Sequence, residues 1–295
     1  FRPNYVNRSG ELKKTANLLS HRTNGVPTNE DATEEIRQLF GTDVMSHPKP
    51  SGLMKYLIRA VTSDDDIVLD FFAGCGTAAH GVWLQNIEDE GQRRFILVQL
   101  PEPIDSENPE GKAGFDFCRT HSLRSNIAEI CKERLRRTAD KLQSGGPLFN
   151  IDSGFRVFKL ASSNICAWEP DRDNIAQTLE SSIVHLKTDR SEQDVLFELL
   201  LKLGLELTVP IESNTIAGKN VYSIGAGTLL VCLSDQIGRE EVEQLAMGIV
   251  AWRTQLATAG ESQVVFRDST FSDDVAKTNL SAILQQNGIE NIRSL

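Results

Sequence analysis

The hydrophobic and polar positions of this chain predict an alternation of short strands and helices. The apolar stretches Ile67–Leu69 and Arg93–Pro101 are expected to form two buried strands. A turn containing glycine lies between them and leads into a helix that starts at Thr77. Apolar residues at helical spacing predict further helices over about 31–40, 53–62 and 122–142. This alternation indicates an α/β fold.

The pattern changes after Gly145-Gly146-Pro147, which is expected to end the long helix. Strands are predicted there over 155–161, 221–224, 228–233 and 262–267, with helices over 191–204, 240–251 and 273–286. Three other stretches, residues 86–92, 101–121 and 162–190, are predicted to be loops. The second region is therefore expected to be a smaller α/β domain.

Composition limits the classes of protein that fit. The 295 residues are 40% apolar and 24% charged, as in ordinary globular proteins. No apolar run approaches the roughly 18 residues of a membrane helix. The five cysteines form no Cys-x-x-Cys pair and the histidines are isolated, so neither a disulfide framework nor a metal site is expected, and a reducing cytoplasm fits best. A net charge of −10 is unusual for an isolated DNA-binding protein, so any DNA-facing surface is a local patch or lies elsewhere.

The glycine turn carries the candidate chemistry. Asp70 stands at the end of the first strand, and Gly74 and Gly76 allow the backbone to approach a ligand closely. A carboxylate cannot bind phosphate, but it accepts hydrogen bonds from a sugar hydroxyl or an amine, which suits a nucleoside without phosphate, such as S-adenosylmethionine. The turn also matches the dinucleotide pattern G-x-G-x-x-A, but Gln99 replaces the acid expected after the second strand.

The stretch Asp70-Phe-Phe-Ala-Gly-Cys-Gly-Thr77 resembles the cofactor motif of DNA amino-methyltransferases, Asp-x-Phe-x-Gly-x-Gly-Thr. His47-Pro-Lys-Pro50 resembles the motif that precedes it in the class whose cofactor region follows the catalytic region. Residues 93–102, 127–137, 154–160, 193–204, 210–211 and 266–271 resemble the modification subunit of type III restriction-modification systems. The resemblance implies N6-adenine methylation of DNA with S-adenosylmethionine, in a complex with a restriction subunit.

The resemblance also implies a fold and a set of site residues. The fold is a partial Rossmann-like methyltransferase sheet plus a smaller C-terminal α/β domain. The implied cofactor-binding residues are Lys49, Pro50, Asp70, Phe71, Phe72, Ala73, Gly74, Gly76, Thr77 and Gln99. For two of them a plainer interpretation stays open: Phe71 as ordinary core and Lys49 as a surface residue. Cys75 is interpreted as a small turn residue. Arg134, Arg136 and Arg137 are expected on a solvated helix face, with phosphate contact as the alternative.

The sequence departs from the family at one point. These enzymes catalyse with an Asp/Asn-Pro-Pro-Tyr/Phe loop that holds the flipped base, and no Pro-Pro pair occurs here. We therefore assign no catalytic or metal-binding residue, and we expect the C-terminal portion of the subunit, inactive alone. Its DNA contacts would lie mainly in missing N-terminal parts, and the full subunit is expected to form a homodimer. The alternatives are an assembly module with a relict cofactor fold and a dinucleotide-dependent oxidoreductase.

Three parts are expected along the chain. Residues 1–45 are interpreted as the tail of a preceding recognition or linker region, either solvated or facing nucleic acid. Residues 46–147 are the expected cofactor-binding part of the methyltransferase domain. Residues 148–295 are the expected C-terminal α/β assembly domain, an assignment that depends on the resemblance and on the absence of a catalytic motif.

Overall fold

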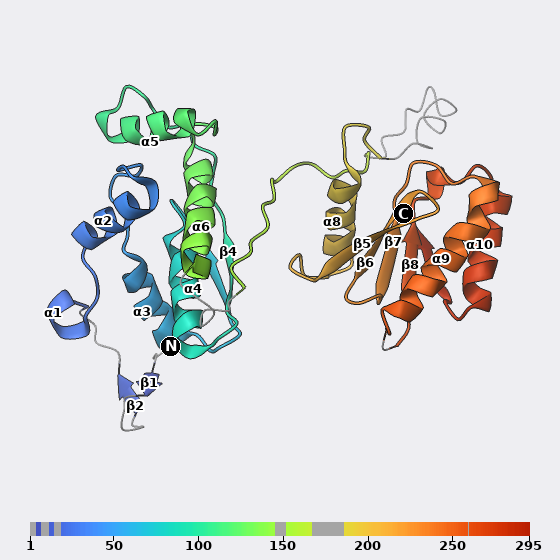
Figure 1. Cartoon of the computed structure of the whole chain (residues 1–295), viewed down its shortest axis with the longest axis horizontal. Helices are drawn as coiled ribbons and strands as arrows, with labels where there is room; N and C mark the ends of the chain where they lie inside the picture. The colour runs from blue at the N-terminus through green and yellow to red at the C-terminus, as the bar shows by residue number, and fades with distance from the viewer. Residues whose placement is uncertain (1–3, 7–11, 15–18, 145–151, 167–185, 259) are drawn as a thin grey trace, which may run out of the picture. The chain divides into compact units, whose positions relative to one another are not determined.

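The computed structural model describes residues 4–6, 12–14, 19–144, 152–166, 186–258 and 260–295 (Figure 1). The chain divides into two compact units, Phe1–Phe155 and Arg156–Leu295, and each unit has hydrophobic clusters of its own. The predicted boundary at Gly145-Gly146-Pro147 lies outside the described residues.

The first unit contains helices and short strands in alternation, as the hydrophobic pattern predicts. Its helices are α1 (His21–Asn24), α2 (Asn29–Phe40), α3 (Ser51–Val61), α4 (Thr77–Asp89), α5 (Pro109–Thr120) and α6 (Ile127–Ser144). Its strands are β1 (Asn4–Val6), β2 (Leu12–Lys14), β3 (Ile67–Asp70) and β4 (Arg94–Leu97). The predictions of α2, α3 and the start of α4 are confirmed.

The prediction of loops over 86–92 and 101–121 is partly wrong. Helix α4 continues to Asp89, four residues into the expected loop 86–92. Helix α5 occupies much of the stretch 101–121, where several prolines and glycines indicated irregular chain. Pro109 stands in the first turn of α5, and the side chain of Asn108 caps the helix by accepting from the backbone nitrogen of Glu110 at 3.0 Å. The proline therefore starts a helix here instead of preventing one.

Helix α2 is part of a hydrophobic core. Ile36, Leu39 and Phe40 are buried in one cluster with Phe117 of α5 and Ile130 of α6. The helix begins with a capping box between Thr28 and Asp31 and ends at Gly41 in the left-handed conformation. The expectation of a solvated linker is therefore wrong for this segment, because its apolar face is covered.

Strands β3 and β4 pair in parallel, with Leu69 opposite Ile96. On one face Phe95 and Leu97 pack in a cluster with Trp83 and Leu135 from α4 and α6. On the other face Ile67, Leu69 and Ile96 are each about half exposed. The strands were predicted correctly, but the expectation that they are buried is wrong for this face. Apolar runs in parallel sheets are usually covered on both faces, and here helices cover one.

The second unit is a sheet with helices on both faces (Figure 1). Its elements are α8 (Glu192–Lys202), β5 (Ile211–Ile216), β6 (Lys219–Ile224), β7 (Leu229–Cys232), α9 (Val242–Gln255), β8 (Gln263–Phe266), α10 (Asp274–Gln286), β9 (Asn291–Ser294) and short 3₁₀ turns at Arg239–Glu241 and Asp268–Thr270. The strand order is β5-β6-β7-β8-β9, antiparallel through β7 and parallel from β7 to β9. Helices α9 and α10 share a core cluster with one set of strand residues, and α8 shares another.

Most of the second unit follows its hydrophobic pattern. The hairpin β6–β7 and the helices α8, α9 and α10 are confirmed. The strand predicted over 155–161 is wrong: this segment has no regular secondary structure, and Val157, Phe158 and Leu160 are exposed. Both edge strands, β5 and β9, were not predicted. Together the two units confirm a mixed α/β protein. In the described part of the chain, no helix has the length and apolar character needed to cross a membrane.

Candidate functional site

The candidate site is the turn between β3 and α4. Gly74 and Gly76 both have positive φ angles, +54° and +81°, which side chains rarely tolerate. The nitrogen of Gly76 donates to the carbonyl of Ala73 at 2.7 Å, and the nitrogen of Ala73 donates to the carbonyl of Val98 at 3.2 Å. A Cβ added at Gly76 would lie 2.9 Å from the sulfur of Cys131 in α6, so glycine is required there for packing as well. The turn is thus held against both β4 and α6.

The side chains before the glycines are accessible. Asp70 ends β3, and its Oδ1 accepts from the backbone nitrogen of Phe72 at 3.1 Å. Phe71 and Phe72 are 60% and 85% exposed, and their rings meet edge to face with centroids 5.4 Å apart. The interpretation of Phe71 as ordinary core is therefore wrong. The carboxylate and the two rings remain available to a ligand at the end of the strand.

The backbone at the start of α4 is buried. Gly76 is its N-cap residue, and no side chain caps the helix there. Thr77 is buried, and its hydroxyl faces Arg134 inside the unit. Helix N-termini attract electron-rich groups because their first N–H groups have no partner in the helix. The Thr77 hydroxyl and the Gly76 nitrogen are therefore both engaged within the unit, and only the backbone N–H groups after Gly76 remain as donors at this helix start.

Gln99 contacts the turn directly. Its Oε1 accepts from the nitrogen of Gly74 at 2.7 Å, and its Nε2 donates to the carbonyl of Leu100 at 3.1 Å. The side chain that was expected to bind the cofactor therefore fastens the glycine turn to the end of β4.

The Lys49–Pro50 segment lies at the start of α3. Lys49 is exposed, and Pro50 is buried as the N-cap residue. Helices α3 and α4 approach closely at Gly81, where an added Cβ would lie 2.7 Å from the Cβ of Met54. This contact places the segment that precedes α3 next to the helix that begins at the glycine turn.

A buried polar cluster joins the two predicted cofactor segments. Glu35 of α2 accepts from the nitrogen and the hydroxyl of Ser51 at 3.1 and 2.9 Å through Oε2. Its Oε1 lies 2.7 Å from Nδ1 of His80 in α4 and 2.8 Å from Nη2 of Arg134 in α6. The Nη1 of Arg134 donates to the hydroxyl of Thr77 at 2.8 Å. Sequence reasoning missed Glu35 because its partners lie far away along the chain.

The charges in this cluster are set by burial and by neighbours. Burial alone would raise the pKa of Glu35, but the hydrogen bond and charge of His80, the Arg134 guanidinium and the Ser51 N–H together lower it to about 2. Burial lowers the pKa of His80, and the nearby Arg134 acts in the same direction. We therefore assign an ionised Glu35 that accepts a hydrogen bond from Nδ1–H of His80, whose ring is neutral near neutral pH and adds its charge only in acid.

The three arginines of α6 were predicted to lie on a solvated helix face, and two of them do not. Arg134 is fully buried, and its Nη1 also donates to the sulfur of Cys75 at 2.9 Å. Arg137 lies over the ring of Phe117, 4.9 Å from its centroid, and donates to the carbonyl of Leu39 at 3.1 Å. The prediction is wrong for both residues, and only Arg136 of the three has a side chain that is about half exposed.

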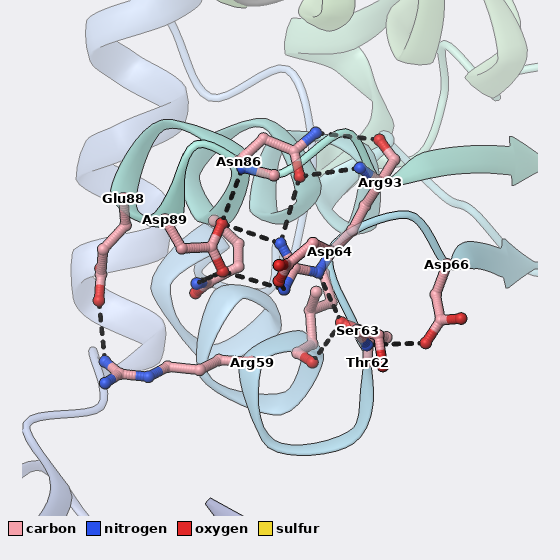
Figure 2. A network of polar contacts seen from close by, with 12 residues as sticks. Arg59, Thr62, Ser63, Asp64, Asp66, Asn86, Glu88, Asp89 and Arg93 are labelled. Atoms are coloured by element: carbon pink, nitrogen blue, oxygen red, sulfur yellow. Dashed lines mark hydrogen bonds and ion pairs between the residues drawn. The ribbon is translucent and has the colours of Figure 1, made fainter. Parts of the chain in front are cut away.

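A second network holds the loop that precedes β3. Figure 2 shows the guanidinium of Arg93 between this loop and the end of α4. Its Nη1 and Nη2 each donate to one carboxylate oxygen of Asp89 at 2.9 Å, and its Nε donates to the hydroxyl of Thr62 at 2.7 Å. The backbone of Arg93 also exchanges two hydrogen bonds with the side chain of Asn86. Because Arg93 directly precedes β4, this network sets where both strands begin.

The cysteines and the possible metal ligands add no further chemistry to the site among the described residues. All five cysteines are free, and burial raises the pKa of Cys131 to about 12. Among the described residues, no three His, Cys, Asp or Glu side chains gather as they would around a metal ion. The side chains that the site presents are a carboxylate and two exposed aromatic rings, a set that can bind an uncharged or cationic nucleoside.

Comparison with known proteins agrees with this geometry. The DNA methylase family model matches residues 11–98, which include the glycine turn and the Lys49–Pro50 segment.

Relatives are found among modification enzymes. The chain is 36% identical over 154 residues to the Mod subunit of the type III restriction-modification enzyme StyLTI from Salmonella typhimurium, covering 49% of this chain and 22% of that protein. It is 31% identical over 193 residues to the EcoP15I Mod subunit from Escherichia coli, covering 65% and 27%. It is 38% identical over 111 residues to the type II methyltransferase M.KpnI from Klebsiella pneumoniae, covering 38% and 24%. These matches span about a quarter of each relative's length. The chain is thus related to type III Mod subunits, which confirms the resemblance predicted from the sequence.

Proposed function

We propose that this chain supplies the S-adenosylmethionine-binding part of a site-specific, adenine-N6 DNA methyltransferase of a type III restriction-modification system. The observation that carries the proposal is the turn from Asp70 to Thr77, which Arg134 and Glu35 link to Ser51, next to the Lys49–Pro50 segment, within the stretch matched by the DNA methylase family. In this proposal β3, β4 and their helices are part of a Rossmann-like methyltransferase sheet within the predicted part 46–147.

The residues present fit such a cofactor. The Asp70 carboxylate accepts hydrogen bonds from hydroxyl or amino groups, and the backbone N–H groups of the first turn of α4 after Gly76 would donate to a carboxylate. Phe71 and Phe72 present exposed rings that stack on adenine or on a sulfonium chain. Lys49 is exposed two residues before Ser51, which Glu35 and Arg134 link to the turn, and Gln99 keeps the turn in place. When bound, S-adenosylmethionine supplies an activated methyl group.

Base positioning is assigned elsewhere in this proposal. The 295 residues contain no Pro-Pro pair, so no Asp-Pro-Pro-Tyr loop is present to hold an adenine. We propose that another polypeptide segment carries that loop and most of the DNA contacts. The second unit, within the predicted part 148–295, would serve assembly with a restriction subunit or a second Mod subunit, and the setting would be the cytoplasm.

Titration calorimetry with S-adenosylmethionine tests the proposal. The chain is expected to bind it, and Asp70→Ala is expected to weaken binding about tenfold or more, since a charged hydrogen bond contributes roughly 1.5–3 kcal/mol. Asp65→Ala is the matched control, because Asp65 is exposed in the loop before the same strand. Binding of NAD instead would favour the oxidoreductase alternative, and binding of neither would favour the assembly module.

Methyl transfer is a separate test. The chain alone is expected to leave unmethylated DNA unchanged when incubated with radiolabelled S-adenosylmethionine. Incorporation of label by the chain alone would contradict the assignment of the base-holding loop to another segment.

A further inference from the structure

One carboxylate contacts residues next to both segments that are proposed to hold the cofactor. Glu35 Oε2 accepts two hydrogen bonds from Ser51, the residue that directly follows Pro50. Glu35 Oε1 lies 2.7 Å from His80, in the first turn of the helix that begins at Thr77. Glu35 itself is part of α2 and lies outside both segments.

Arg134 extends this link to the glycine turn itself. Its Nη2 donates to Glu35, from which it is separated by 99 residues, and its Nη1 donates to Thr77 and to the sulfur of Cys75. Cys75 lies between Gly74 and Gly76. The Glu35 carboxylate is therefore connected to the turn through Arg134, which donates to Thr77 and Cys75. It is connected to the start of α3 through its two hydrogen bonds with Ser51.

Burial makes this arrangement rigid. The Arg134 side chain is fully buried, and the side chains of His80 and Glu35 are 11% and 20% exposed. Charge-assisted hydrogen bonds are short, directional and strong away from water, and a buried charge without its partner is costly. The cluster therefore has one favourable arrangement, which fixes the distance between the Pro50–Ser51 and Cys75–Thr77 backbones.

We propose that Glu35 is a positioning residue for the cofactor site, holding the Lys49–Pro50 segment and the glycine turn at the separation that S-adenosylmethionine requires. This inference rests on the proposed function. Glu35 contacts no part of the site that is exposed to ligand. Its effect on affinity is indirect, through Ser51 on one side and through Arg134 on the other.

The variant Glu35→Gln separates this role from simple packing. The amide has almost the same shape and keeps an oxygen for Ser51, but it removes the charge that pairs with Arg134. Glu34→Gln is the matched control, because Glu34 is the adjacent residue of α2 and is exposed. Arg134→Lys keeps the positive charge but loses the two-pronged geometry that reaches both Glu35 and Thr77.

Two measurements on the full chain test the proposal. In calorimetry, Glu35→Gln and Arg134→Lys are each expected to bind S-adenosylmethionine about tenfold more weakly than Glu34→Gln, at a temperature where circular dichroism shows all of them folded. In hydrogen exchange followed by mass spectrometry, faster exchange is expected in the peptides that contain Ser51 and Cys75–His80. A purely structural role would instead speed exchange evenly across α2, α3, α4 and α6.

The outcomes are distinguishable from failure of the proposed function. If the unaltered chain does not bind S-adenosylmethionine, the proposed function fails, while exchange in the two segments still reports whether Glu35 couples them. If Glu35→Gln binds as tightly as Glu34→Gln, or if its two segments exchange as in the unaltered chain, the positioning role is overturned. If Glu35→Gln is unfolded, Arg134→Lys decides by the same two criteria, and if both are unfolded the cluster is a folding element and the proposal is overturned.

Discussion

The backbone nitrogen of Gly74 donates to the side-chain oxygen of Gln99 at 2.7 Å, across 25 residues of sequence. The turn after β3 is thus fastened by a side chain two residues beyond the end of β4. Parallel strands place their carboxyl ends at the same edge of a sheet, so this bond spans the edge where ligands of open α/β sheets bind.

Replacing this acceptor is expected to loosen the turn. In Gln99→Leu the Gly74 N–H loses its partner, which costs about 1 kcal/mol, so amide exchange in residues 73–76 should be about fivefold faster. Gln99→Glu keeps an acceptor and should protect the turn. Gln92→Leu is the control, since Gln92 is exposed before the same strand. Unchanged exchange in Gln99→Leu would show that the turn holds its shape without the bond.

The two glycines of the turn are expected to respond differently to alanine. At Gly76 a Cβ meets a φ of +81° and the Cys131 sulfur at 2.9 Å, whereas at Gly74 the nearest atom lies 3.9 Å away. Gly76→Ala should lower the free energy of unfolding by about 2 kcal/mol, and Gly74→Ala by about 1 kcal/mol for the backbone alone. The free energy of unfolding of the first unit can be measured by urea unfolding in a variant whose only tryptophan is the buried Trp83. Equal losses would contradict the packing argument.

Acid is expected to destabilise the first unit through Glu35. Its pKa is about 2 in the folded protein against 4.5 for the free side chain, so the unfolded chain binds more protons between these values. The stabilisation is complete above pH 4.5 and is lost as the pH falls towards 2, a contribution on the order of 3 kcal/mol. Glu35→Gln should therefore be less stable than the unaltered chain at pH 5 to 7 and should approach it at pH 2.

His80 adds to this acid sensitivity. Its pKa is lowered from 6.5, so protonation also favours the unfolded chain as the pH falls below 6.5. Urea unfolding of Glu35→Gln, Glu34→Gln and the unaltered chain across this range provides the comparison. A constant difference between the first variant and the unaltered chain at every pH would show that the lowered pKa of Glu35 is not the cause.

Arg93 is expected to matter more for stability than an exposed arginine. Arg93→Met keeps most of the length of the side chain but removes the two guanidinium donors to Asp89, which keeps only Gln85 and the Gly91 nitrogen, and it removes the donor to the Thr62 hydroxyl. The expected loss is about 2–3 kcal/mol, less than for a fully buried pair because Asp89 is partly exposed. Arg124→Met, at an exposed position, should change stability little. Urea unfolding in the variant whose only tryptophan is Trp83 again measures the stability of the first unit.

Much of this fold follows from local sequence signals. Thr28 with Asp31 and Ser191 with Asp194 form capping boxes at helix starts, and Gly41 ends a helix. Helix α5 was missed because Pro109 was interpreted as a breaker, although a proline in the first turn favours a helix. The edge strand β5 was missed because its central residues Glu212–Thr215 are polar and exposed, so no apolar alternation marks it.

Local sequence signals predict only part of the candidate site. The glycine turn is visible in the sequence because its requirement is local, a backbone that needs glycine. The roles of Glu35 and Arg134 are not visible, since a charged residue on a helix usually faces water and their partners lie 16 to 99 residues away. The strand predicted over 155–161 failed for the converse reason: alternating apolar residues form a strand only where another strand pairs with them.

The open face of β3 and β4 affects how the protein behaves in salt. Ile67, Leu69 and Ile96 keep apolar surface in water, and salts such as ammonium sulfate raise the free energy of that contact. Such salts therefore favour any association that covers this face, and a single lysine at position 69 would oppose it. The chain is therefore expected to precipitate at a lower ammonium sulfate concentration than Leu69→Lys does. The cause would be the apolar surface of these three side chains and not the net charge of the protein.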